Sequence, residues 1–199
     1  MPSPTGWRNI PTRRGRIPTN PMSCSIPRKC RRWRNGFASP PTTSVWWKAG
    51  RNMIIHMRGS LFDTPAQTLV NPVNTVGVMG KGLALQFKQR DPAMFADYRR
   101  ACQQGAIALG RPYLYRSPHG PWVVQFPTKR HWRDRSRLSD IAEGLRCLAD
   151  HCDSWGITSL AVPALGCGLG GLDWYAVRPL IVRALSPLTI PVWIVAPDR

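Results

Sequence analysis

The chain has 199 residues and a formal net charge of +18, which is extreme for a protein of this length. No apolar run approaches the roughly 20 residues of a membrane-spanning helix, and the basic N-terminus is not followed by the apolar segment of a secretory signal. The six cysteines include no CxxC pair, which favours free thiols in a reducing compartment over a zinc site or a disulfide framework. We therefore expect a cytoplasmic protein that has no membrane segment and needs neither a metal nor a cofactor.

The positive charge is concentrated in the first quarter of the chain. Residues 1–52 contain eleven Lys or Arg, eight Pro and no Asp or Glu, whereas residues 53–199 contain seventeen basic and ten acidic residues. The first segment shows neither strand alternation nor a helical period, so we predict that it is disordered. It is interpreted either as a basic Pro-, Arg- and Trp-rich arm that grips nucleic acid, or as a segment upstream of the natural start at Met53. Residues 53–199 are predicted to form one domain.

From Met53 onward, short apolar strands alternate with segments of helical spacing. In chain order the predicted elements are strand 53–57, strand 68–73, helix 81–90, helix 92–104, strand 111–117, strand 121–127, a helix that ends near 152, strand 157–165, helix 174–185 and strand 190–196. Ser136 or Ser139 is predicted to cap the third helix. This alternation argues for an α/β domain with three layers, α/β/α, around a central mixed β-sheet.

Two glycine-rich segments each follow a predicted strand and lead into a predicted helix. They are NPVNTVGVMGKG at 71–82 and GCGLGG at 166–171. Neither has the spacing of a Rossmann GxGxxG, and the first lacks the Ser or Thr that follows Gly-Lys in a P-loop. Glycine lets backbone N–H groups approach an anion, and a helix N-terminus adds a favourable dipole. At the carboxyl ends of adjacent strands, the two segments would form a crevice that grips a diphosphate.

A basic and aromatic segment, FPTKRHWR at 126–133, follows another predicted strand. Lys129 is the first charged residue after that strand, so its amine is expected to point into the crevice. Partial desolvation and neighbouring cations would lower its pKa and make it a usable nucleophile. Phosphate contacts and stacking on single-stranded nucleic acid are predicted for Arg130, His131, Trp132 and Arg133. The alternative for this segment is an ordinary solvated loop.

Three motifs in this order, NPVNTVGVMGKGLALQFK, FPTKRHWR and PALGCGLGGLDW, resemble the macrodomain of the DarG family, the antitoxin partners of DarT toxins. They are also similar to the human terminal ADP-ribose protein glycohydrolase. The resemblance covers about residues 53–197 and implies a macrodomain that removes ADP-ribose from thymine bases of single-stranded DNA. The implied partners are ADP-ribosylated single-stranded DNA, ADP-ribose and a DarT-like toxin, and we expect a monomer. Hydrolysis of ADP-ribose from acidic protein side chains and non-catalytic ADP-ribose binding stay open as alternatives.

The resemblance also implies roles for individual residues. Lys129 aligns with the lysine that related enzymes use at the anomeric carbon, where it either attacks that carbon or stabilises the departing base. The adenine side is assigned to Ser60 and Leu61. ADP-ribose binding is implied for Asn71, Asn74, Thr75, Gly80, Lys81, Gly82, Leu83, Thr128, Gly166, Cys167, Gly168, Leu169, Gly170 and Gly171.

Three positions depart from the pattern of these relatives. The human relative has an aspartate where this chain has Gly170, so Lys129 is expected to act without that acid. Many macrodomains place an aspartate for the adenine amino group where this chain has Ser60, so adenine recognition is expected to rest on backbone groups or to be weaker. Full-length antitoxins of this kind carry a toxin-binding domain after the macrodomain, whereas this chain stops at Arg199, so direct toxin sequestration is not expected of it.

Overall fold

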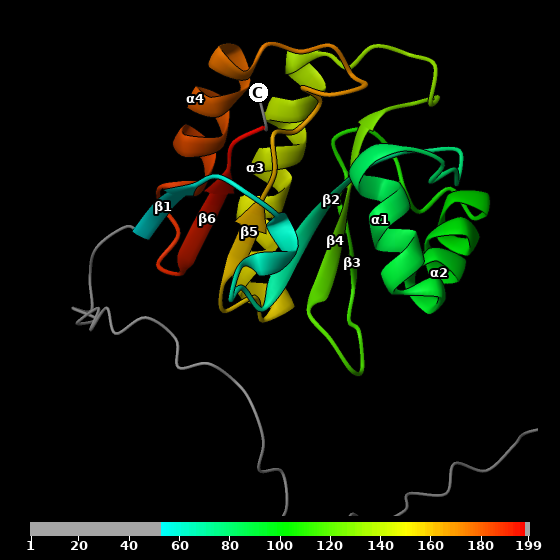
Figure 1. Cartoon of the computed structure of the whole chain (residues 1–199), viewed down its shortest axis with the longest axis horizontal. Coiled ribbons are helices and arrows are strands. Elements are labelled where there is room, and N and C mark those ends of the chain that lie inside the picture. Colours follow the sequence, from blue (N-terminus) through cyan, green and yellow to red (C-terminus); the bar gives the residue numbers. More distant parts are fainter. Residues whose placement is uncertain (1–52, 198–199) are drawn as a thin grey trace, which may run out of the picture. The chain divides into compact units, whose positions relative to one another are not determined.

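A computed structural model describes residues 53–197, in which strands and helices alternate along the chain (Figure 1). The predicted disordered segment 1–52 lies outside the described residues, and both interpretations of it stay predictions. Every predicted strand and helix is present, and within the described residues only the short 3-10 helix η1 was not predicted. The elements are β1 (Met53–Met57), η1 (Leu61–Asp63), β2 (Thr68–Asn74), α1 (Gly82–Arg90), α2 (Pro92–Gln103), β3 (Tyr113–Tyr115), β4 (Trp122–Lys129), α3 (Leu138–Trp155), β5 (Leu160–Val162), α4 (Trp174–Leu185) and β6 (Pro191–Val195).

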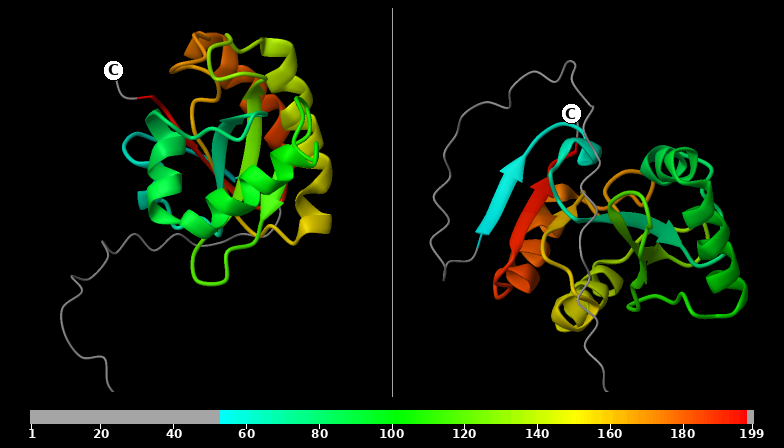
Figure 2. Two further views of the ribbon diagram at one scale, coloured as in Figure 1. Left: turned by 90° about the vertical axis from the view of Figure 1, so that its right-hand side faces the viewer. Right: turned by 90° about the horizontal axis from the view of Figure 1, so that it is seen from below.

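The six strands form one sheet in the order β1-β6-β5-β2-β4-β3. All neighbouring strands are parallel except β3 and β4, which are antiparallel. Helices α1 and α2 cover one face of the sheet, and α3 and α4 cover the other (Figure 2). The predicted three-layer architecture with a mixed sheet is therefore confirmed. Since the parallel strands end at the same edge, the segments that follow β2, β4 and β5 meet there.

Each face of the sheet carries its own hydrophobic core. On one face, Ile141, Leu145 and Leu148 of α3 are fully buried, as the helical spacing predicted. On the other face, Phe87 of α1 and Met94 of α2 pack beneath the helices. Each such side chain contributes about 1.5–3 kcal/mol through burial. The central strands are covered on both sides, which explains their nearly continuous apolar sequence.

The predicted cap of α3 is wrong. Its N-cap is Arg137, whose side chain makes no capping hydrogen bond. Ser136 is instead buried against the segment 166–171, and Ser139 lies within the helix. A side-chain cap contributes about 1 kcal/mol, and α3 forms without one while Ser136 packs against Gly166 and Gly170. Strand β5 is also shorter than predicted at both ends, and at its C-terminal end this is because Pro163 follows it and has no N–H for the ladder.

The sequence predicted free thiols and neither a membrane segment nor a metal. Within residues 53–197, no helix is long and apolar enough to cross a membrane. In the same range, no cluster of three or more His, Cys, Asp or Glu side chains is placed to hold a metal ion. The four cysteines in the described part of the chain are free thiols.

Candidate functional site

The segment after β2, residues 75–81, is called glycine loop 1 below, and Asn74 organises it from beneath. The Oδ1 atom of Asn74 accepts hydrogen bonds from the N–H groups of Val76 (3.1 Å) and Val78 (3.3 Å), and its Nδ2 donates to the Val78 carbonyl. Gly77 permits this turn because its φ is +77°, a value that other residues rarely adopt. ADP-ribose binding was predicted for Asn74; in this structure the residue is 6% exposed and its amide holds the loop.

Tyr98 of α2 supports Asn74 from the other side. Its hydroxyl oxygen lies 2.8 Å from the Asn74 carbonyl oxygen and 3.1 Å from Oδ1. Burial raises the pKa of Tyr98, so its hydroxyl stays protonated and remains a donor at physiological pH. Tyr98 was not among the predicted site residues. Its sequence position could have indicated the role, because Tyr98 follows Met94 by four positions and therefore lies on the same buried face of α2. A tyrosine hydroxyl buried on that face needs a hydrogen-bond acceptor.

Asn71 lies deeper in β2 and is fully buried. Its Nδ2 donates to Gln125 Oε1 at 3.1 Å, while its Oδ1 has no hydrogen-bond partner among the described residues. Thr75 ties glycine loop 1 to the end of β4, since both its N–H and its hydroxyl donate to the Arg130 carbonyl at 3.0 Å. Asn71 and Thr75 therefore shape the loop and the neighbouring strand ends.

The N-terminus of α1 completes the first loop. Its N-cap is Lys81, whose side chain makes no capping hydrogen bond, so the first N–H groups of the helix are left for another acceptor. Gly82 has a φ of +60°, and Gly80, Lys81 and Gly82 are exposed. Leu83 is half-buried against the core beneath α1. Uncapped, exposed N–H groups at a helix N-terminus form a ready site for an anion.

The segment 166–171, called glycine loop 2 below, joins β5 to α4. It is closed by hydrogen bonds from Gly171 N–H to the Gly168 carbonyl and from Leu172 N–H to the Gly166 carbonyl, both 3.0 Å. Among the described residues, the N–H groups of Leu169 and Gly170 have no protein acceptor. Burial raises the pKa of the Cys167 thiol to about 11, so the thiol stays protonated and is a poor nucleophile. The loop therefore offers backbone donors, not reactive side chains.

Gly170 has no room for a side chain. A Cβ atom at this position would overlap the Ser136 hydroxyl and the Gly166 carbonyl oxygen. Ser136 also donates its N–H to the Gly170 carbonyl at 3.0 Å, which joins glycine loop 2 to the segment before α3. The absence of an aspartate at Gly170 is thus built into the packing of this loop.

Lys129 is the last residue of β4 and connects that strand to glycine loop 2. The ladder between β2 and β4 shifts by one residue, so that Lys129 lies opposite Asn74. Its Nζ donates to the carbonyls of Leu169 (2.9 Å), Asp134 (3.1 Å) and Trp132 (3.4 Å). The preceding Thr128 is buried, and its hydroxyl donates to the carbonyl of Val73 in β2.

The protonation state of Lys129 is set by opposing effects. Desolvation by burial lowers its pKa from the ordinary value of 10.5, while the negative charge of Asp134 acts in the opposite direction. The predicted direction is therefore correct, with burial as the main cause. A neutral amine has two N–H bonds and an ammonium has three, so the three carbonyl acceptors fit the ammonium.

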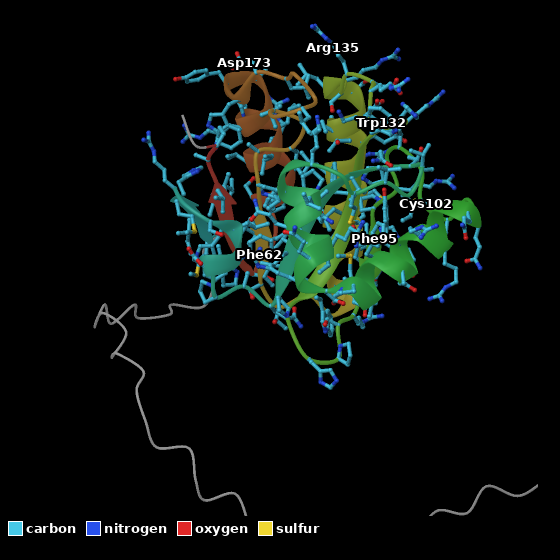
Figure 3. The ribbon with its side chains drawn as sticks, turned by 45° about the vertical axis from the view of Figure 1, so that its right-hand side comes forward. Phe62, Phe95, Cys102, Trp132, Arg135 and Asp173 are labelled. Carbon is cyan, nitrogen blue, oxygen red and sulfur yellow. The ribbon has the colours of Figure 1, made fainter. Side chains whose placement is uncertain are left out.

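A basic segment, residues 130–137, follows Lys129 at the same sheet edge, where Figure 3 labels Trp132 and Arg135. Trp132 is 46% exposed, and the Arg133 guanidinium lies 4.4 Å from the centre of its ring. A cavity of about 490 Å³ lies beside Lys129. Its lining includes Arg130, Asp134, Arg135 and Arg137. Of the predicted DNA-contacting residues, Arg130 lines this cavity, and Trp132 and Arg133 are exposed in the same segment. His131 is turned into the loop, where its Nδ1 accepts from the Arg133 N–H.

The predicted adenine side lies after β1, at the same edge of the sheet. The Ser60 hydroxyl accepts from the Phe62 N–H at 3.2 Å and caps η1, and Leu61 is buried. The Ser60 hydroxyl is thus used as a cap, and a serine at this position has no carboxylate to offer an adenine amino group.

The comparisons with known proteins agree with this geometry. The Macro domain family model matches residues 70–181. The DNA ADP-ribosyl glycohydrolase of Thermus aquaticus is 43% identical over 151 residues, which cover 73% of this chain and 41% of that protein. A DNA ADP-ribosyl transferase-DNA ADP-ribosyl glycohydrolase fusion protein of Thermosipho africanus is 43% identical over 159 residues and is also covered to 41%. The chain therefore spans less than half the length of these relatives.

Solved structures show the same relationship. The macrodomain of Thermus aquaticus DarG superposes with a TM-score of 0.69 at 43% identity, covering 73% of this chain and 99% of that one. Thermosipho africanus DarTG in complex with ADP-ribose superposes with a TM-score of 0.72, covering 74% of this chain and 43% of that one. With the family model, the sheet order and the paired glycine loops in agreement, this chain belongs to the macro domain family and has the macrodomain fold of the DarG proteins.

Proposed function

We propose that this protein is a DNA ADP-ribosyl glycohydrolase, which releases ADP-ribose from thymine bases of single-stranded DNA and so reverses the action of a DNA ADP-ribosyltransferase toxin. The observation that carries the proposal is the position of Lys129, whose Nζ lies 2.9 Å from the Leu169 carbonyl of glycine loop 2. The Lys129 amine is thus held where β2, β4 and glycine loop 2 meet, which is where the ligand is proposed to bind.

The diphosphate of ADP-ribose is held by backbone N–H groups in this proposal. The donors are the uncapped first turn of α1 and the N–H groups of Leu169 and Gly170. Each hydrogen bond to a charged group contributes about 1.5–3 kcal/mol. Lys81, at the start of α1, adds positive charge on the exposed side. The complex of the Thermosipho africanus relative with ADP-ribose supports this choice of ligand.

Lys129 acts on the departing base. Breaking the bond between the anomeric carbon and a thymine nitrogen leaves negative charge on the base, and an ammonium beside it stabilises that charge or donates a proton. Water then adds to the anomeric carbon. The three carbonyl acceptors favour this role over direct attack by the amine, since attack needs a neutral nitrogen with a free lone pair.

The basic segment supports a nucleic-acid substrate over a modified protein. Exposed Arg130, Arg133 and Arg135 provide charge for a phosphate backbone, and exposed Trp132 provides a face on which a base stacks. The names of the relatives also support DNA as the substrate.

The experiment offers ADP-ribosylated single-stranded DNA and ADP-ribosylated protein to the wild type and to Lys129→Ala. We expect release of ADP-ribose from DNA by the wild type, loss of most of it in the variant, and an ADP-ribose affinity that changes by less than about tenfold, since a transition-state group is removed and the phosphate site is kept. Release only from protein would replace the proposed substrate. Tight binding without turnover of either substrate would leave a binding module.

A trapping experiment separates the two roles of Lys129. If the amine attacks the anomeric carbon, the bond to thymine breaks and the base leaves with the proton that the amine loses. The sugar ring then opens to an imine, and added cyanoborohydride reduces this to a stable amine bond between ADP-ribose and Lys129. We expect no such adduct by mass spectrometry during turnover. An adduct on Lys129 would show that the nitrogen acts as a nucleophile.

A further inference from the structure

A second basic surface lies beside glycine loop 1, against helices α1 and α2. A cavity of about 360 Å³, called the helical groove below, opens between this loop and helices α1 and α2. Its lining includes Val78 and Gly80 of the loop, Lys88 of α1, and Phe95, Arg99 and Gln103 of α2. None of these side chains has a role in the proposed hydrolysis.

The groove combines positive charge with an aromatic ring. The Lys88 Nζ lies 4.4 Å from the centre of the Phe95 ring, and the Arg99 guanidinium lies 5.9 Å from it. Phe95 is half-buried between α1 and α2, where Figure 3 labels it. Two cations around an aromatic ring are typical of surfaces that bind a phosphate backbone and stack a base.

The positive charge of the groove is not neutralised by neighbouring carboxylates. The two acidic residues nearest to it along α2 are used elsewhere. Asp97 pairs with Arg100 at 2.6 Å and accepts from the Tyr113 hydroxyl, while Asp91 caps α2 by accepting from the Met94 N–H. Within the described residues, neither Lys88 nor Arg99 forms a salt bridge.

The groove is continuous with the proposed ADP-ribose site. Gly80 belongs both to the groove and to the loop that leads into the uncapped N-terminus of α1. On the same loop, Val76 and Val78 are 47% and 40% exposed, so apolar surface borders the cations. The groove therefore adjoins the N-terminus of α1, where the diphosphate is proposed to bind.

From this arrangement we propose that the helical groove binds the single-stranded nucleic acid next to the modified base, with Lys88 and Arg99 on its phosphates and Phe95 against a base. The inference rests on the proposed function, because it extends the substrate-binding surface of the same site. The basic segment then binds the strand on one side of the reacting base, and the helical groove binds it on the other.

The test measures binding of a fluorescently labelled, thymine-rich single-stranded DNA that carries no ADP-ribose, by anisotropy over a range of salt concentrations. The variant is the full chain with Lys88→Gln and Arg99→Gln. The control is the full chain with Arg146→Gln and Arg183→Gln, which removes the same charge from exposed positions of α3 and α4 on the opposite face of the sheet. Residues 1–52 are the same in every protein, so differences between the proteins report the substitutions. Thermal melting verifies that each variant is folded.

We expect the slope of log affinity against log salt to fall by about 1.4 in the variant, since each lost phosphate contact on a single strand accounts for about 0.7. At about 50 mM salt the affinity should fall by at least about tenfold, and the control should change by less than about twofold. A third variant, Phe95→Leu, should weaken binding to single-stranded DNA while duplex DNA, whose bases are not free to stack, is bound as before.

Equal losses in variant and control, or an unchanged affinity and slope, would overturn the inference. So would an equal loss of binding to duplex DNA in both proteins with changes in the groove, because this would indicate a general anion surface. The assay involves no hydrolysis, so it is independent of the proposed function. If the groove variant loses DNA binding and the wild type releases no ADP-ribose from DNA, only the proposed activity is refuted.

Discussion

Gly170→Ala tests how glycine loop 2 is built. The added Cβ overlaps the Gly166 carbonyl oxygen, which is backbone, and the buried Ser136 hydroxyl, so the loop itself has to move. Overpacking of this kind costs about 1–3 kcal/mol. For a domain of this size, each kcal/mol lowers Tm by about 2–4 °C, so we expect a fall of roughly 2–12 °C.

The same movement should weaken ADP-ribose binding. Movement of the loop displaces the N–H groups of Leu169 and Gly170, which are the proposed donors to the diphosphate. The loss of even one hydrogen bond to a charged group costs about 1.5–3 kcal/mol. We therefore expect at least about a tenfold weaker affinity for ADP-ribose by isothermal titration calorimetry.

Gly168→Ala is the matched control for stability. Gly168 lies in the same loop, its φ is not positive, and a Cβ there meets nothing within 4 Å. Its free energy of unfolding should stay within about 0.5 kcal/mol of the wild type. A Gly170→Ala protein that melts and binds ADP-ribose like the wild type would refute the packing argument.

Three further predictions concern Tyr98, Lys129 and Trp132. Tyr98→Phe removes the hydroxyl beside the Asn74 carbonyl and should lower the free energy of unfolding by about 1–2 kcal/mol in urea titrations; no change would show that glycine loop 1 does not need this support. If the ammonium of Lys129 assists the departing base, kcat should fall as the pH rises through its pKa, which burial holds below 10.5; a kcat that rises over the same range would indicate the neutral amine instead. Trp132→Ala should weaken binding to modified single-stranded DNA by about 1–3 kcal/mol in anisotropy titrations and should leave the affinity for ADP-ribose unchanged. An equal loss of affinity for both ligands would exclude a stacking role for Trp132.

Much of the fold could be predicted because its elements have strong local patterns. The period of Ile141, Leu145 and Leu148 marks the inner face of α3, and Pro92 marks the start of α2. The predicted ends of elements were wrong where tertiary packing overrides a local sequence preference. Ser136 has the chemistry of an N-cap, but the structure uses it to fill the space behind Gly170.

The loops and the lysine of the candidate site could be predicted, whereas most of the contacts between them could not. Composition alone marks both glycine loops, and position after a strand marks Lys129. The shared contacts could not be predicted, because they join residues far apart in sequence. Tyr98 reaches Asn74 across 24 positions, and Lys129 reaches Leu169 across 40. The helical groove was missed for another reason, since it forms only when α1 packs against α2.

The most direct test of the account is a crystal structure of this protein with ADP-ribose. It should show the diphosphate accepting hydrogen bonds from the N–H groups of Leu169 and Gly170 and from the first turn of α1, with the Lys129 Nζ beside the anomeric carbon of the distal ribose. ADP-ribose bound away from both glycine loops, or a Lys129 side chain turned into solvent in the complex, would contradict the proposed site and its chemistry.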